Sequence, residues 1–81
     1  MESKSNIPAI ESLIFAAPQA IQKEEIKYCL ENSQGLSISM EDILADLETI
    51  KTRYQAPEFG IELKEVGGGY QFLSKPDYFS L

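Results

Sequence analysis

The chain has 81 residues, 43% of them apolar and 25% charged, and its 13 acidic and 7 basic residues give a net charge of −6 with no histidine. This length supports a single domain with a thin core, because a chain of this size buries only about 60% of the surface that its unfolded form exposes. A negative charge of this size repels phosphate backbones and anionic lipid headgroups. We therefore expect a small globular domain that neither binds nucleic acid through its overall charge nor works at a membrane surface.

Targeting and disulfide signals point to the cytoplasm. No stretch approaches the roughly 18 consecutive apolar residues of a transmembrane helix. Residues 1–6 lack the basic and apolar regions of a signal peptide, and we expect them to form a disordered polar tail. The single cysteine, Cys29, excludes an intramolecular disulfide framework. The sequence thus predicts a cytoplasmic protein without a membrane partner.

The first predicted helix begins near residue 7. Pro8 suits its first turn, where the missing N–H is not needed. Apolar residues then follow at the i, i+3, i+4 and i+7 spacing of an amphipathic helix, at Ile10, Leu13, Ile14 and Ala17. Pro18 ends this helix because the residue before a proline is pushed out of helical geometry.

A short extended link around residues 20–21 leads to a second helix over roughly residues 23–32. Its apolar stripe consists of Ile26, Cys29 and Leu30, and residues 32–35 provide the stop. We place Cys29 in the core, because a thiol on an apolar stripe is commonly buried.

The third helix has the clearest start in the chain. Ser39 is a good N-cap, and Asp42 sits three residues later, where its carboxylate can reach the free backbone donors. Ile38 and Ile43 have the spacing of a hydrophobic staple. The helical period then continues to about residue 54 through Met40, Ile43, Leu44, Leu47, Ile50 and Tyr54.

From residue 60 the apolar period changes to two, which predicts a β-hairpin around the three glycines at 67–69. A two-residue turn at Gly67 and Gly68 fixes the register. It pairs Val66 with Gly69, Leu63 with Phe72, and Ile61 with Ser74. Because paired residues share a face, this register gathers one apolar face from Ile61, Leu63, Tyr70 and Phe72. A slip of one residue would split that set between the two faces.

The order of helix, short strand, helix, helix and hairpin is a winged-helix arrangement: an α+β, mostly α, fold with a three-helix core and a two-stranded wing. We assign residues 7–75 to this domain and residues 76–81 to the start of a truncated helix or a linker to a second domain. The predicted core consists of Leu13, Ile14, Ile26, Leu30, Ile43, Leu47, Ile50, Leu63 and Phe72.

Two stretches resemble a known family. They are Ile10-Glu11-Ser12-Leu13-Ile14-Phe15-Ala16 in the first helix, and the hairpin from Gly60 to Phe72 with the following Ser74-Lys75-Pro76-Asp77-Tyr78. Together they span residues 10–78 and resemble the N-terminal domain of the segregation and condensation protein B family. Between the first two helices the family usually reads Gly-x-Pro-Leu-Ser. The present chain has residues 18–22 there, with Gln22 as a poorer N-cap than Ser.

The resemblance implies a scaffolding role in the bacterial condensin complex. Members of this family look like dimers that bind the kleisin subunit ScpA, which bridges the heads of an SMC ATPase in chromosome condensation and segregation. The ATP chemistry belongs to that partner. Members carry a second winged-helix domain that is absent from residues 1–81, and the resemblance implies a cytoplasmic, nucleoid-associated protein.

The residues themselves offer no catalytic, cofactor or metal site. Cys29 has no histidine to activate it as a nucleophile. Asp42 and Asp46 are i, i+4 neighbours on a helix surface, without the spacing of a calcium loop. The glycines at 67–69 lack the Gly-Lys-Ser/Thr ending of a phosphate loop and do not lead into a helix. We therefore predict a protein that is not an enzyme and uses no cofactor.

Direct DNA binding is the alternative function, because many winged helices place the third helix in the major groove. Here the third helix carries four acidic and two basic residues, and the wing over 58–66 carries three acidic and one basic. Each element is thus net −2, whereas groove binding relies on lysine and arginine that neutralise phosphates. A winged-helix transcription regulator remains the second reading, and an enzyme the third.

The predicted register also defines a candidate protein interface. Val66 and Leu73 point to the face opposite the core, and three further apolar residues follow at the C-terminal end. The candidate interface residues are Val66, Leu73, Tyr78, Phe79 and Leu81. Such a cluster suits contact with a second copy of the chain or with the second domain. The alternative is that scattered exposed apolar residues are ordinary.

Overall fold

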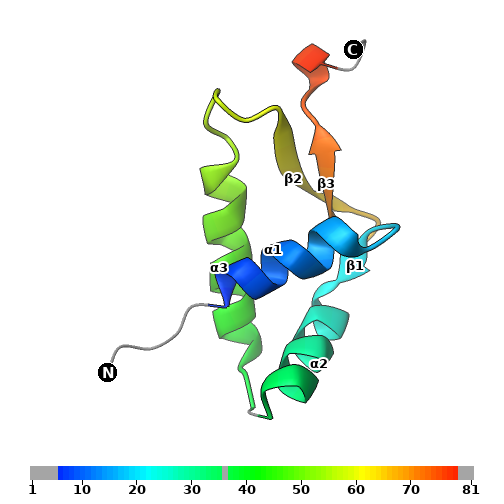
Figure 1. The fold of residues 1–81 in the computed structure, drawn as a ribbon, viewed down its shortest axis with the longest axis vertical. Helices are drawn as coiled ribbons and strands as arrows, with labels where there is room; N and C mark the ends of the chain where they lie inside the picture. Colours follow the sequence, from blue (N-terminus) through cyan, green and yellow to red (C-terminus); the bar gives the residue numbers. More distant parts are fainter. Residues whose placement is uncertain (1–5, 36, 79–81) are drawn as a thin grey trace.

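The computed structural model describes residues 6–35 and 37–78 of the chain. The elements follow the predicted winged-helix order (Figure 1). They are α1 (Ile7–Ala16), β1 (Ile21–Gln22), α2 (Lys23–Gln34), α3 (Met40–Arg53), β2 (Ile61–Val66), β3 (Gly69–Ser74) and the short 3₁₀-helix η1 (Pro76–Tyr78). The predicted fold class is confirmed. Of the predicted disordered tail, only Asn6 lies within the described residues.

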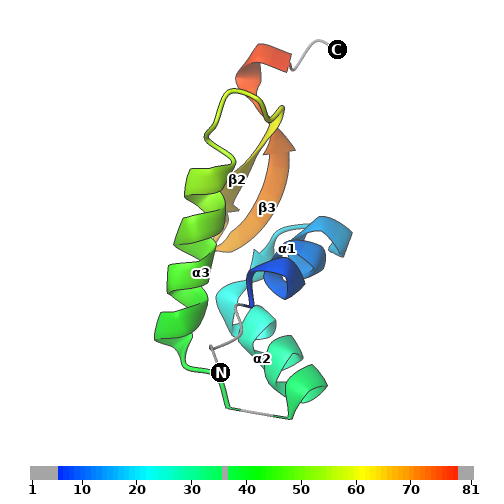
Figure 2. The same cartoon turned by 60° about the vertical axis from the view of Figure 1, so that its left-hand side comes forward.

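The helix ends follow the local sequence. α1 has its proline in the first turn and stops where Ala17 turns extended, at φ −71° and ψ 135°. α2 runs two residues beyond its predicted end and closes on Gly35, whose left-handed φ of 69° lets its N–H donate to the Glu31 carbonyl at 2.8 Å. α3 begins as predicted, with the Asp42 N–H donating to Ser39 Oγ at 3.1 Å. Figure 2 shows α1 beside α3 and above α2.

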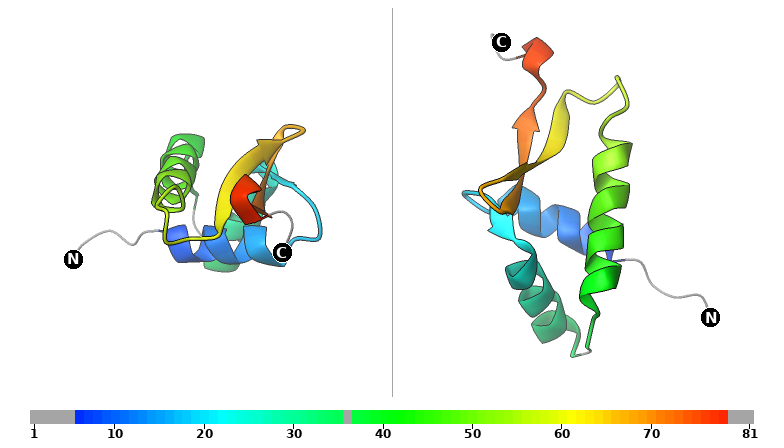
Figure 3. Two further views of the ribbon diagram at one scale, coloured as in Figure 1. Left: turned by 90° about the horizontal axis from the view of Figure 1, so that it is seen from above. Right: turned by 180° about the vertical axis from the view of Figure 1, so that it is seen from behind.

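The sheet has three antiparallel strands in the order β1-β3-β2. The predicted hairpin register is confirmed: Ile61 pairs with Ser74, Leu63 with Phe72, and Val66 with Gly69. Both turn glycines, Gly67 and Gly68, have positive φ, 56° and 84°, as a two-residue hairpin turn of type I′ requires. The extended link predicted around residues 20–21 forms the short strand β1, which pairs with β3 and so extends the two-stranded wing to a three-stranded sheet. Seen from behind in Figure 3, β2 lies on the side of α3 and β1 lies at the opposite edge.

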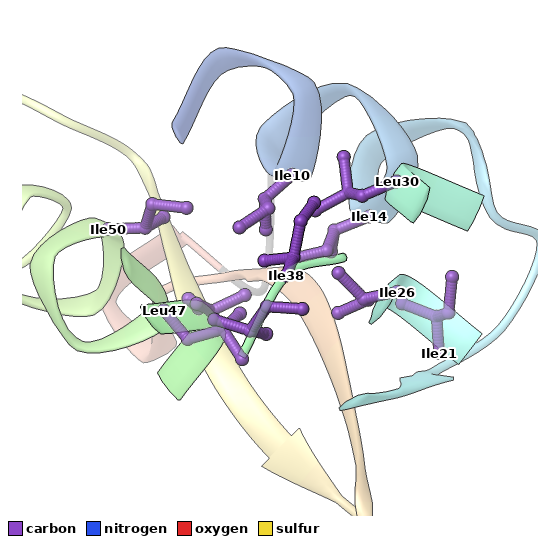
Figure 4. Packing of buried hydrophobic residues seen from close by; sticks show 10 residues of the cluster. Ile10, Ile14, Ile21, Ile26, Leu30, Ile38, Leu47 and Ile50 are labelled. Atoms are coloured by element: carbon purple, nitrogen blue, oxygen red, sulfur yellow. The ribbon is translucent and has the colours of Figure 1, made fainter. Parts of the chain in front are cut away.

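The core lies where the three helices meet the sheet (Figure 4). The buried residues are Ile10, Ile14, Ile21, Ile26, Leu30, Ile38, Ile43, Leu47, Ile50 and Leu63. Leu13 and Phe72 pack against this cluster and are only partly buried. The core position predicted for Cys29 is wrong: its side chain is half-buried and its thiol is free. Ile26 and Leu30 form the centre of the α2 stripe, which leaves Cys29 on its flank.

The start of the C-terminal segment is tied to the loop that follows α3. The Lys75 ammonium donates to the Ala56 carbonyl at 2.7 Å, and the Lys75 N–H donates to the Gly60 carbonyl at 2.9 Å. Beside this tie, the Tyr54 ring packs against Phe59 and Phe72 with centroids 4.8 and 5.1 Å apart. These contacts hold the open end of the hairpin against the C-terminal end of α3.

Candidate interaction surface

Charge is divided unequally between the elements. Residues 6–22, which include α1 and β1, contain one charged residue, Glu11, and β3 contains none. The Glu11 carboxylate is already engaged by Arg53 of α3, at 3.2 Å. We call the outer surface of α1, residues 17–20, β1 and β3 the neutral face. The outer surfaces of α2, α3 and β2 carry most of the remaining charges and form the charged face.

The neutral face contains a groove with a volume of about 250 Å³. It forms where the C-terminal end of α1 meets the second half of β3, beyond the two residues that β1 covers by pairing with Gly69 and Tyr70. The residues that line it are Ile14, Phe15, Ala17, Ile61, Gln71, Phe72, Leu73 and Ser74. None of them carries a charge, so the groove suits an apolar or uncharged partner group.

Among residues 6–35 and 37–78, Phe15 is the most exposed large apolar residue, with 78% of its surface accessible. It follows Ile14, which is buried, and one residue turns a helix by about 100°, so the Phe15 ring points away from the core. Phe15 lies outside the apolar stripe of α1, and such a stripe indicates only the inward positions of a helix. A bulky aromatic residue off the stripe, on a helix with one charge, was the signal that would have found it.

The candidate interface residues that the structure describes, Val66, Leu73 and Tyr78, lie at different places on the surface. Val66 and Leu73 are exposed on the outer face of the hairpin, at 41% and 38%. Val66 pairs with Gly69 beside the turn, whereas Leu73 pairs with Glu62, four residues along the strand. At about 3.3 Å per residue, the two are about 13 Å apart. Leu73 instead shares its groove with Phe15.

The C-terminal part of the predicted interface is only partly described. Tyr78 is exposed, and it lies on η1 close to Gly60, away from Val66. Phe79 and Leu81 lie outside the described residues. Leu73 therefore lies in the same groove as Phe15 of α1, whereas Val66 and Tyr78 lie elsewhere on the surface.

The charged face has the wrong sign for a phosphate backbone. On the outward side of α3 it includes an open surface lined by Ala45, Glu48, Thr49, Thr52 and Arg53. The pKa of Tyr70, on the inner side of the hairpin, is raised by burial and then by the nearby Glu65 carboxylate, whereas the Lys23 ammonium lowers it and Glu48 adds a smaller increase. α3 and the wing each carry two more acidic than basic residues, whereas a DNA-binding winged helix uses basic residues there to neutralise phosphates.

Two carboxylates inside the charged elements have structural partners. The Glu31 carboxylate accepts hydrogen bonds from the Lys27 ammonium and the Ile38 N–H, both at 2.8 Å, and these bonds lower the pKa of Glu31. Burial raises the pKa of Asp46, although the hydrogen bond from the Asn6 N–H opposes this change. Glu31 therefore holds the loop before α3, and Asp46 holds the start of α1.

Within residues 6–35 and 37–78, no group of three metal-ligating side chains gathers in one place. None of the described helices combines the length and apolar character that crossing a bilayer requires.

Comparison with known proteins gives one family. Residues 8–81 match the family model described as "Segregation and condensation complex subunit ScpB". The chain is 30% identical over 70 residues to "Segregation and condensation protein B homolog" of Coxiella burnetii (strain RSA 493 / Nine Mile phase I), covering 85% of this chain and 31% of that protein. It is 28% identical over 72 residues to "Segregation and condensation protein B" of Moorella thermoacetica (strain ATCC 39073 / JCM 9320), covering 89% and 34%. The chain thus spans about one third of the length of these relatives.

Solved structures share the fold. A crystal structure of a dimer of the ScpB N-terminal domain complexed with ScpA peptide superposes with a TM-score of 0.79 at 24% identity, over 95% of this chain and 86% of that one. ScpB from Mycobacterium tuberculosis gives a TM-score of 0.76 at 12% identity, over 96% and 46%. At these identities, the likeness establishes the winged-helix fold of this chain.

Proposed function

The chain belongs to the ScpB family of segregation and condensation complex subunits, and from this membership we propose that it is a non-catalytic subunit of a bacterial SMC–kleisin condensin complex. It acts through protein contacts, namely self-association and binding of the kleisin ScpA, in chromosome condensation and segregation. The SMC ATPase, reached through the kleisin, supplies the ATP chemistry. The protein works in the cytoplasm in association with the nucleoid.

The family match over residues 8–81 carries this proposal. It agrees with the resemblance found in the first helix and the hairpin. The related crystal structure supports it further, because that N-terminal domain is itself a dimer with a bound ScpA peptide. The surface of the present chain fits such a role: it exposes large apolar side chains on the hairpin and on α1, where a protein partner gains most from removing them from water.

The domain organisation is part of the same proposal. Residues 7–75 form the N-terminal winged-helix domain, and residues 76–81 lead to a second domain of the same kind. The support is length, because the relatives are about three times as long as the segment that the chain matches. In the full-length protein, Val66, Leu73 and Tyr78, together with Phe79 and Leu81, contact a partner chain or the second domain.

A pull-down tests the proposal. Full-length protein carrying an affinity tag is expected to recover the kleisin and SMC subunits from cell extract. A matched variant with Val66→Asp and Leu73→Lys places charges on the outer face of the hairpin and leaves the core intact. We expect it to recover less kleisin at equal expression. Recovery of neither subunit by the unmodified protein would remove the proposed function.

The second candidate function is a DNA-binding regulator, which the winged-helix fold by itself would permit. The acidic α3 and wing disfavour it. We expect no duplex binding tighter than about 0.1 mM at physiological salt, the weak end of non-specific affinity. Micromolar binding in a fluorescence titration at that salt would favour the regulator.

A further inference from the structure

The exposed Phe15 side chain lies directly beside the groove of the neutral face. The Phe15 ring projects into solvent at the rim of the groove that Leu73 and Ile14 help to line. A cavity of about 150 Å³ already accommodates benzene, so a groove of about 250 Å³ has room for a phenyl ring. One small surface therefore presents both an aromatic knob and a hole of suitable size.

The charge distribution favours contact between two copies of the chain through the neutral face. Two copies of a chain with net charge −6 repel each other. Each of α2, α3 and β2 carries more acidic than basic residues, so contact through their outer surfaces brings two net negative surfaces together. The neutral face avoids this cost, because its one charged residue, Glu11, is paired with Arg53. Depletion of charge is also what distinguishes the centre of a protein interface from the rest of a surface.

From these two observations we infer that the neutral face is the self-association surface of the chain, with Phe15 of each copy filling the groove of the other. The inference rests on the proposed self-association and gives it a location. A two-fold interface uses the same patch on both copies, so the patch must be complementary to itself. The adjacent knob and groove meet that requirement. Ser12 and Ala16, both exposed and uncharged, extend the contact along α1.

Sedimentation velocity over a concentration series tests the inference. The Phe15→Gln substitution removes the aromatic knob and keeps a good helix former. The matched control is Tyr28→Gln, since Tyr28 is also a highly exposed aromatic residue (66%), on α2. A two-fold dimer loses two anchors at once, so we expect Phe15→Gln to raise the dimer dissociation constant by about 100-fold or more. Tyr28→Gln should leave it unchanged.

Thermal melting of the dilute variants separates loss of contact from loss of fold. Phe15 is exposed, so the Phe15→Gln monomer should melt as the unmodified monomer does. Unchanged dimerisation of folded Phe15→Gln would overturn the location. If that variant of the full-length protein still recovers kleisin and SMC subunits, the proposed function stands while this inference fails. A wild-type chain that remains monomeric at every concentration would also overturn the inference.

Nuclear magnetic resonance provides a test without substitution. Backbone amide shifts of the wild-type chain are compared between dilute and concentrated samples. We expect the changes to concentrate at the end of α1 and over residues 71–74. Changes confined to the outer surfaces of α2 and α3 would contradict the inference. If these amides shift only when a kleisin peptide or the second domain is added, the groove belongs to that partner instead of a second copy.

Discussion

α1, on the neutral face, and α3, on the charged face, have similar buried sides and different exposed sides. α1 buries Ile10 and Ile14, and α3 buries Ile43, Leu47 and Ile50, all in one cluster. Behind this common core, α1 presents serine, alanine and phenylalanine to solvent, whereas α3 presents mainly glutamate, threonine and lysine. The core therefore constrains one side of each helix and leaves the other side to specify partners.

Under the proposed function, a fold often used on DNA serves protein contacts. The surfaces that usually approach DNA, α3 and the wing, are acidic here. The apolar groove lies elsewhere, between α1 and β3. The proposed contacts therefore use a different surface of the same core arrangement.

The largest effect is expected from the buried side of α3. Leu47→Ala removes a side chain that is 2% exposed and should cost about 2–5 kcal/mol, a large share of the stability of a small domain. The matched control is Leu44→Ala on the flank of the same helix, where 39% of the side chain is exposed. Urea unfolding of both variants measures the difference. Equal losses would mean that α3 does not have the inner and outer sides described here.

A smaller effect is expected where the neutral face depends on close backbone approach. A Cβ atom on Gly69 would lie 3.1 Å from the carbonyl carbon and Cβ of Ala20 and from the Ile21 oxygen. Two of these atoms are backbone, so β1 must shift away from β3 to accept it. We expect Gly69→Ala to cost about 1–3 kcal/mol in thermal unfolding. Gln71→Ala, on the same strand, is the control, and a Gly69→Ala domain as stable as this control would refute the close approach.

The smallest effect is expected at Glu31, in the charged region. Its pKa is lowered in the folded state, so its stabilising contribution is present above the ordinary value of about 4.3 and is lost as the pH falls through the folded pKa. Glu31→Gln should therefore melt below the wild type near neutral pH, by less than Gly69→Ala does. The gap should close in acid. A gap that persists at low pH would show that the charge of Glu31 does not matter.

Local signals predicted most of the fold. The N-cap at Ser39 depends on one hydrogen bond, and the hairpin register depends on two glycines with positive φ and on alternating apolar residues. β1 is too short to show a period, so its pairing with Tyr70 was not predictable in this way. The half-burial of Cys29 depends on how α2 is rotated against its neighbours.

The interaction surface was less predictable than the fold. The parity of the strands correctly placed Val66 and Leu73 on the outer face. The alternation of side chains between the two faces does not tell how far apart two residues lie along one face. It therefore gave no indication of the distance between Val66 and Leu73. The groove joins Phe15 to Leu73, which are distant in sequence, and it exists only because α1 docks beside β3.

The tie at Lys75 has a mechanical consequence. A pull on the chain after residue 75 would otherwise open the hairpin from its end, one pair of hydrogen bonds at a time. Two hydrogen bonds of Lys75 oppose this opening. Its ammonium donates to the Ala56 carbonyl, and its backbone N–H donates to the Gly60 carbonyl. Tension is passed first to the loop after α3, and a charge-assisted hydrogen bond must break before the strands begin to separate. The domain can therefore transmit force from its C-terminal side into α3 while its sheet stays closed.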